Sequence, residues 1–273
     1  MQSERLAHLI GFQPEWPAPS FVQAFMTTRQ GGVSVGPWTS LNVGSHVGDD
    51  PKHVHANREL VAKTLQVQAV YVKQVHGAHG QTIDASTPET SELDVTWTTQ
   101  LKLACAMMVA DCLPLLVCHP HEKWVASVHA GWRGLAGHEG HGVVETLHQA
   151  VKAQGLQPQD CLVWLGPCIG QTAFEVGVDV LNAFGNPDSL LATQASFQAL
   201  GANKFSADLA GIARARLISA GFLRLYGNDS SPPWCTYHQQ GLYHSHRRDF
   251  KAKGGSGRMA AYIWITDEGQ ICP

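Results

Sequence analysis

Short apolar runs rich in strand-forming residues constrain the fold of this 273-residue chain more than any other feature. Three other segments show helical periodicity, and they are residues 57–65, 143–154 and 208–220. The runs that we predict to be strands are residues 70–75, 103–110, 114–118, 124–128, 162–165 and 260–265. Because strands and helices do not alternate as regular βαβ units, the pattern favours an α+β or mixed α/β fold over a doubly wound parallel sheet.

The ends of the predicted helices carry ordinary helix signals. Gly155 and Gly221 follow two of them and are suitable stops, and Ser206 is a plausible N-cap for the segment 208–220. The segment 57–65 is expected to follow a histidine-rich turn that contains His53 and His55.

Composition indicates one globular domain over residues 1–273, because 44% of the residues are hydrophobic and no repeat or linker divides the chain. The net charge of −3, without a run of Lys or Arg, argues against a nucleic-acid partner. No apolar stretch approaches the roughly 18 residues of a membrane span, and residues 1–9 lack a signal-peptide core. The seven cysteines are irregularly spaced, which is typical of a protein of the reducing cytoplasm.

The chain has fifteen histidines, and a sequence rich in histidine favours a metal site. His76, Cys112 and His129 each lie at or just after the end of a strand-like run and precede small or turn-forming residues. They are too far apart for a structural zinc module, but three such ligands suit an open catalytic site with a fourth position for water. From spacing alone, a buried thiol and two unrelated histidines explain the pattern as well.

Two glycine-rich stretches are candidate anion sites. Residues 131–142 precede a predicted helix and form either a phosphate cradle or a flexible loop. Residues 253–258 follow Arg247 and Arg248, which either pair with surface carboxylates or clamp a phosphate. Cys168 is expected to be a structural thiol.

A series of motifs in fixed order resembles the YfiH-type laccase-domain proteins, which have been called polyphenol oxidases, peptidoglycan-editing factors and purine nucleoside phosphorylases. The similarity covers residues 25–260, and its most specific part is His-Ala-Gly-Trp-Arg-Gly at 129–134 with an upstream Asp-Cys at 111–112. The other matching stretches are Thr-Thr-Arg at 27–29, Ser-Leu-Asn at 40–42, Gln-Val-His-Gly at 74–77, Gly-Pro-Cys-Ile-Gly at 166–170 and Ser-His-Arg-Arg-Asp at 245–249.

The resemblance implies a zinc site made by His76, Cys112 and His129, on a β-sandwich-like mixed sheet core with flanking helices. It also implies phosphorolysis of adenosine, inosine and methylthioadenosine, and hydrolytic deamination of adenosine. Our hypothesis adds Asp111 as an acid/base group or a partner of the metal ligands. Asn42 is expected to bind a nucleoside hydroxyl or base edge. The candidate phosphate ligands are Arg29, Arg58, Arg133 and Arg248.

Three other functions compete with this one. A copper-dependent polyphenol oxidase would use Cu²⁺ at the same N/S ligands, although the chain is short for a blue-copper laccase and has only three His-x-His pairs. A thiol hydrolase would use Cys112 as its nucleophile and need no metal. An amidase would remove a wrong amino acid from a peptidoglycan precursor. The usual zinc deaminase signature, H-x-E with P-C-x-x-C, is absent.

Overall fold

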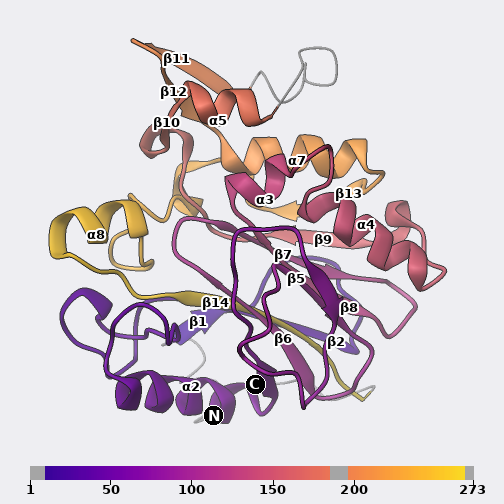
Figure 1. Cartoon of the computed structure of the whole chain (residues 1–273). Helices are drawn as coiled ribbons and strands as arrows, with labels where there is room; N and C mark the ends of the chain where they lie inside the picture. Colours follow the sequence, from indigo (N-terminus) through magenta and orange to yellow (C-terminus); the bar gives the residue numbers. More distant parts are fainter. Residues whose placement is uncertain (1–9, 185–195, 268–273) are drawn as a thin grey trace.

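Two large β-sheets lie face to face at the centre of the molecule (Figure 1). The computed structural model describes residues 10–184 and 196–267. Residues 1–9, in which we expect no signal peptide, and Cys272 lie outside the described residues. Among the described residues, no helix is long and apolar enough to cross a membrane.

The first sheet has five strands. In spatial order they are β1 (Gly11–Phe12), β2 (Val22–Thr27), β14 (Met259–Ile265), β6 (Leu103–Val109) and β3 (Gln68–Val70). Neighbouring strands are antiparallel, except that β3 pairs with β6 in parallel. The second sheet has six strands and is antiparallel at its centre. They are β13 (Arg224–Gly227), β9 (Leu162–Leu165), β7 (Leu113–Cys118), β8 (Val125–Ala130), β5 (Val95–Thr98) and β4 (Gly80–Thr82).

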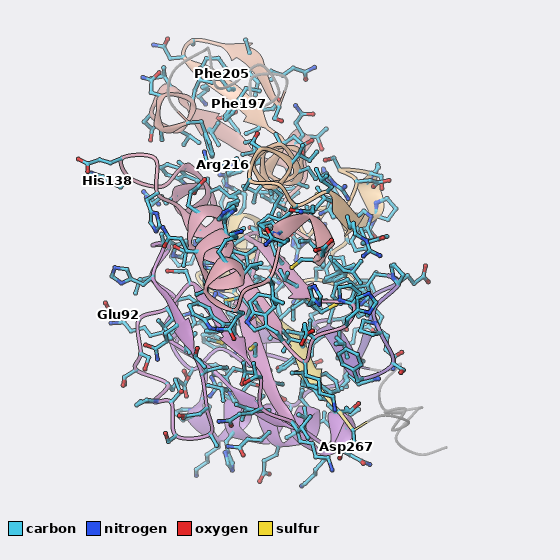
Figure 2. All side chains as sticks on the ribbon, turned by 90° about the vertical axis from the view of Figure 1, so that its right-hand side faces the viewer. Glu92, His138, Phe197, Phe205, Arg216 and Asp267 are labelled. Carbon is cyan, nitrogen blue, oxygen red and sulfur yellow. The ribbon has the colours of Figure 1, made fainter. Side chains whose placement is uncertain are left out.

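A third, three-stranded antiparallel sheet lies at the opposite end of the molecule from α2 (Figure 1). Its strands are β10 (Glu175–Gly177), β12 (Lys204–Ala207) and β11 (Phe197–Gly201). Figure 2 shows Phe197 and Phe205 on this sheet, and both pack against the edge of the main core.

The period-2 pattern of each central strand divides its side chains between two cores. On β7, Leu116 and Cys118 point between the two large sheets, where they meet Trp164. Leu113, Leu115 and Val117 point to the other face of the sheet, toward helices. Burial on both faces explains why the central strands are almost continuously apolar in sequence.

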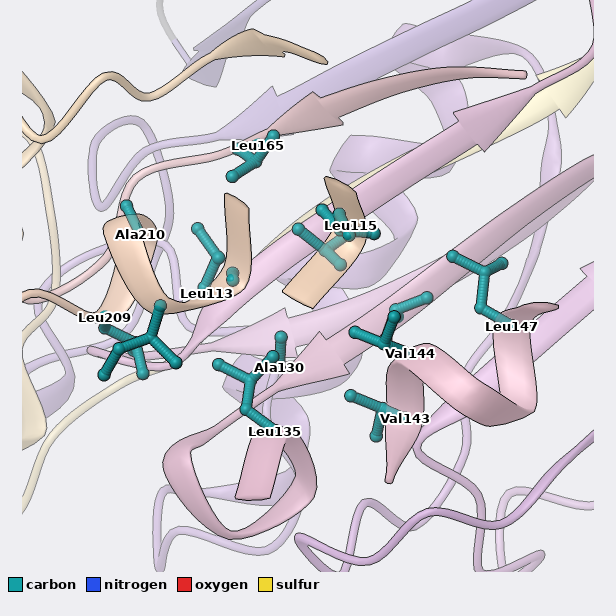
Figure 3. Close-up of a cluster of buried hydrophobic side chains, with 14 of the residues drawn as sticks. Leu113, Leu115, Ala130, Leu135, Val143, Val144, Leu147, Leu165, Leu209 and Ala210 are labelled. Carbon is teal, nitrogen blue, oxygen red and sulfur yellow. The ribbon is translucent and has the colours of Figure 1, made fainter. Parts of the chain in front are cut away.

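Helices cover the outer face of each large sheet. Helix α2 (Pro51–Leu65) packs Val61 and Leu65 on the five-stranded sheet. Helices α3 (Trp132–Ala136), α4 (Val143–Ala153) and α7 (Leu209–Ser219) cover the six-stranded sheet. Figure 3 shows Leu113 and Leu115 of that sheet facing the side chains of these helices. Within residues 10–184 and 196–267, the structure also has α5 (Val178–Ala183), α8 (His246–Lys253) and the 3-10 turns Gly36–Trp38, Pro158–Asp160, Gln171–Ala173 and Pro232–Trp234.

The structure confirms the mixed α/β prediction, with a sandwich of mostly antiparallel sheets and flanking helices. It also confirms strands and helices at all but one of the predicted segments. The predicted strand 70–75 is wrong, because β3 ends at Val70. Beyond it the side chain of Gln74 bonds both backbone groups of Met108, on the next strand of the same sheet, so the main chain of this segment does not continue the ladder.

Helix starts differ from the prediction for local reasons. His53 and His55 lie within α2 and not in a turn before it, because Asp50 caps the helix and Pro51 begins it. Ser206 is not the N-cap of α7, since it is paired in β12, and Asp208 accepts a bond from the backbone N–H of Gly211 instead. The glycine-rich stretch 131–142 contains α3 and then a tight turn, and Figure 2 shows His138 at the tip of that projecting turn.

Candidate metal centre and adjoining cavity

Three side chains from distant parts of the chain converge at one edge of the sandwich. The ligand atoms of His76, Cys112 and His129 all lie within 4.8 Å of one another. The two imidazole rings meet edge to face, with their centroids 4.7 Å apart. Among the described residues this is the one group of three or more His, Cys, Asp or Glu side chains with the spacing of a metal site.

The chain brings Cys112 to this point as it passes from one sheet to the other. Strand β6 of the five-stranded sheet ends at Val109, and β7 of the six-stranded sheet begins at Leu113. Asp111 makes the turn with a φ of +85°. His129 lies on the neighbouring strand β8, opposite Pro114. The thiol and this imidazole are therefore neighbours across the start of a strand pair.

His76 lies in the loop between β3 and β4, and Asp94 holds that loop in place. The Asp94 carboxylate is fully buried and accepts bonds from the backbone N–H groups of His76 (3.1 Å) and Gly77 (2.7 Å), with a longer one from Val75 (3.3 Å). The same carboxylate lies 2.7 Å from Nδ1 of His129. With Nδ1–H donating to Asp94, Nε2 of His129 is left as the metal ligand, so one carboxylate orients two ligands.

The electrostatics of the three side chains favour a thiolate. Burial alone would raise the pKa of Cys112, but His129 and His76 outweigh it and lower that pKa to about 6. Burial would lower the pKa of His129, but Cys112 and Asp94 raise it to about 9. Thiolates and imidazoles are the donors that zinc and copper prefer, so the residues fit such a metal.

A glycine leaves room for the site. A Cβ at Gly131 would lie 3.1 Å from Sγ of Cys112 and 3.2 Å from Cδ2 of His76. Such contacts are tighter than most real Cβ contacts and would displace one of the ligands. The glycine after His129-Ala130 is therefore required by space and not by its backbone angle.

His76, Cys112 and His129 line a cavity of about 410 Å³ that also presents apolar and cationic side chains. The apolar side chains include Ile169, Phe174 and Leu209. The cationic and imidazole groups belong to His46, Arg133, His246, Arg247 and Arg258. The two kinds of group lie next to each other, because the guanidinium of Arg247 is 5.7 Å from the centroid of the Phe174 ring. A cavity with apolar walls and converging polar groups is typical of a small-molecule site.

Asp111, the predicted acid/base residue, lines this cavity but already has its own partners. Its carboxylate accepts bonds from Thr236 Oγ1 (2.6 Å), Ser245 Oγ (3.0 Å) and the backbone N–H of Arg247 (2.7 Å). The contacts show it anchoring the start of α8 beside the site. A role in proton transfer stays a prediction.

The four arginines that we predicted as phosphate ligands do not share one cavity. Arg133 lines the cavity beside the metal ligands. Arg29 and Arg248 line a second cavity, where Arg29 donates to the carbonyl of Thr39 and Arg248 pairs with Asp249. Cys168 is buried and accepts a bond from Asn228, in keeping with a structural thiol.

Arg58 and Asn42 are held by protein partners outside the lining of the metal cavity. Arg58 makes a two-pronged ion pair with Glu89 and lies over the ring of Tyr71. Asn42 is fully buried, and its Oδ1 accepts from the backbone N–H of Arg258 at 2.8 Å. Substrate contact by these two residues stays a prediction.

Sequence reasoning did not predict several residues that the structure places in or next to the site. Among the polar ones are Asp94, His46 and Arg258. Arg258 ends the glycine-rich stretch 253–258, which was a candidate anion site, so a signal for it existed. Asp94 lies in a stretch for which the sequence predicted no helix or strand, and nothing in the local pattern distinguishes it from a surface carboxylate.

Comparison with known proteins gives a consistent result. A family model described as "Multi-copper polyphenol oxidoreductase laccase" matches residues 23–266. A protein of Pseudomonas aeruginosa named "Purine nucleoside phosphorylase PA4543" is 38% identical over 254 residues, which cover 93% of this chain and 98% of that protein. The Escherichia coli (strain K12) protein "Purine nucleoside phosphorylase YfiH" is 39% identical, with 92% and 97% covered.

Solved structures with the same fold include the Neisseria meningitidis protein NMB0706, with a TM-score of 0.82 and 37% identity over 94% of this chain and 99% of that one. YlmD from Geobacillus stearothermophilus superposes with a TM-score of 0.84 and 30% identity, and the match covers 94% of this chain and 97% of that one.

Proposed function

The chain belongs to the multi-copper polyphenol oxidoreductase laccase family, and we propose that it is a zinc-dependent purine nucleoside phosphorylase. Its relatives in Pseudomonas aeruginosa and Escherichia coli carry the name purine nucleoside phosphorylase. The observation that carries the proposal is a candidate metal-ligand trio in the lining of a cavity that also presents apolar and cationic side chains. A purine nucleoside supplies an apolar, flat base, and phosphate supplies an anion.

In this proposal, His76, Cys112 and His129 hold the zinc ion, and Asp94 fixes the tautomer of His129. Zinc bound by two imidazoles and one thiolate supplies Lewis acidity at an open coordination position. Asp94 also fixes the loop that carries His76, so the ligand set is assembled before substrate arrives.

The reaction balances with hydrogenphosphate as the second substrate. An oxygen of phosphate forms a bond to C1′ of the ribose while the bond from C1′ to N9 of the purine breaks. The electron pair of that bond stays on the purine, which takes up the proton that hydrogenphosphate loses. The side chains of Phe174 and Ile169 would hold the base, and arginines of the cavity lining would hold the phosphate.

Product analysis tests this proposal. Adenosine, inosine and methylthioadenosine are incubated with the zinc-loaded protein, with and without phosphate. Free base and ribose 1-phosphate that form only with phosphate support phosphorolysis. Inosine from adenosine without phosphate would assign the deaminase activity that we propose as a second reaction. If neither product forms, the assignment to purine nucleosides is wrong.

Metal analysis separates the family's oxidase description from our proposal. The His-x-His pairs expected for an oxidase are dispersed: His53 and His55 lie on α2, and His119 and His121 follow β7. The described residues contain one cluster of three possible metal ligands, so they offer no second site at which a multi-copper centre could hold another ion. Protein purified without added metal should contain zinc, whereas stoichiometric copper with fast phenol oxidation would favour the oxidase.

Two further assays address the hydrolases. Activity that survives chelation but is lost on thiol alkylation would indicate a Cys112 nucleophile without metal. Release of an amino acid from a nucleotide-linked peptidoglycan precursor, in the absence of nucleoside phosphorolysis, would indicate the editing amidase.

A further inference from the structure

Arg258 is a half-buried cation of the cavity wall, and among the described residues it makes no ion pair with a carboxylate. It precedes β14, and its side chain packs on Gly44, where a Cβ would lie 2.7 Å from Cγ of Arg258. Its backbone N–H donates to the buried Asn42. Both contacts fix the direction in which this side chain enters the cavity that holds the metal ligands.

The guanidinium of Arg258 is only partly used by the protein. Nη1 donates to the carbonyl groups of Ser256 and Gly257, each at 3.0 Å. Within residues 10–184 and 196–267, Nε and Nη2 have no protein acceptor. Burial lowers the pKa of Arg258, and the nearby Cys112 and Asp111 offset only part of that effect. The half-buried guanidinium therefore keeps its Nε and Nη2 edge available in the cavity lining, where an anionic ligand can accept hydrogen bonds from it.

The rest of the wall has the same sign of charge. Arg133 and Arg247 also line the cavity, with the imidazoles of His46 and His246. Asp111 is the acidic residue of the lining, and its oxygens already accept bonds from Thr236, Ser245 and Arg247. A bound metal ion would add positive charge. The cavity therefore favours an anion over a neutral second substrate.

We propose that Arg258 is the phosphate-binding residue of this enzyme and that its Nε and Nη2 edge grips two phosphate oxygens. This planar edge matches two oxygens of a tetrahedral phosphate, and a lysine in the same place would provide only a point charge. The inference rests on the proposed function and deepens it, because it assigns the second substrate to one side chain. The phosphate is either free or part of a nucleotide, and both have the same chemistry.

The test measures phosphate binding directly and separately from turnover. Zinc-loaded wild type, Arg258→Gln, Arg258→Lys and the control Arg224→Gln are titrated with inorganic phosphate, and in a second arm with adenosine 5′-monophosphate. Arg224 is an arginine of β13 that donates to the carbonyl of Asp160 and is absent from the cavity lining. Zinc content and thermal unfolding of each variant are recorded alongside.

We expect Arg258→Gln to weaken phosphate binding, and to raise the KM for phosphate, at least about tenfold while the KM for nucleoside changes less than about threefold. Arg258→Lys should be intermediate and Arg224→Gln unchanged. If Arg258→Gln fails to fold or to retain zinc, the Lys variant alone decides, with an unchanged phosphate affinity counting against the proposal.

The outcomes also distinguish the two levels of the proposal. Arg258-dependent phosphate binding without phosphorolysis would keep the site and overturn the proposed function. Phosphorolysis with an unchanged phosphate affinity in Arg258→Gln would keep the function and overturn the site. Arg258-dependent binding of the monophosphate, without binding of inorganic phosphate, would overturn free phosphate as the ligand.

Discussion

Replacing Asp94 with asparagine should weaken metal binding while leaving every metal ligand in place. The Asp94 carboxylate accepts bonds from four donors: three backbone N–H groups of the loop 75–77 and Nδ1–H of His129. Oδ1 serves His76 and His129, and Oδ2 serves Val75 and Gly77. An amide has only one acceptor oxygen, so its NH₂ group would face two donors in either orientation.

The magnitude follows from those lost bonds. Each buried donor left without an acceptor costs about 1–3 kcal/mol, and two donors are affected, so the metal-free protein should lose about 2–6 kcal/mol of stability. The released His129 ring and the freed loop would also position two of the three ligands less well. Changing such a partner typically costs about 10–100-fold in metal affinity, equivalent to about 1.4–2.8 kcal/mol.

The assay is competition for zinc against a chromophoric chelator, combined with urea unfolding of the metal-free protein. Glu92→Gln is a matched control, because it removes an exposed carboxylate two residues away that pairs with Lys73. We expect the control to bind zinc like the wild type. If Asp94→Asn binds zinc within about twofold of the wild type, the carboxylate does not organise the site and the reasoning is wrong.

Three further predictions follow from the same structure. Zinc affinity should increase with pH, since zinc displaces the His129 proton between pH values of about 6 and 9 and the Cys112 proton as well below about 6. The slope of log affinity against pH should be about one between those two pH values and steeper below the lower one, and a flat profile would contradict the thiolate–imidazolium pair. Gly131→Ala should lower zinc affinity about tenfold or more, because its Cβ would crowd Cys112 and His76, whereas Gly241→Ala, with open space around it, should bind zinc normally. Leu115→Ala should lower the free energy of unfolding by about 2–5 kcal/mol in urea titrations, since Leu115 is fully buried between the six-stranded sheet and its helices, and a loss under about 1 kcal/mol would contradict that packing.

The central strands were predictable because both of their faces are buried. Their sequences are therefore continuous apolar runs, as at β6 and β7. Strands with mixed burial were missed, and β11 is an example in which four of five side chains are exposed. The predicted strand 70–75 has strand-forming residues, but tertiary contacts of Gln74 determine its path.

The metal ligands were predictable only in part. Strand ends marked His76, Cys112 and His129, but spacing could not show that they meet, since that depends on how two sheets stack. The choice among the arginines could not be made from spacing for the same reason. Arg29 and Arg248 each lie in a motif that resembles the family's, and they donate to backbone carbonyls and pair with Asp249 outside the metal cavity. Arg133, which was predicted, and Arg258, which was not, line that cavity.

The turn at Asp111 also bears on when a metal could bind. One candidate ligand lies at that turn, a second on the six-stranded sheet, and a third in a loop held by a carboxylate near that sheet. None of them forms the close ligand pair with which a zinc finger binds metal and drives folding. Because the loop of His76 must first pack beside β7 and β8, we expect metal binding to follow folding here and not to initiate it.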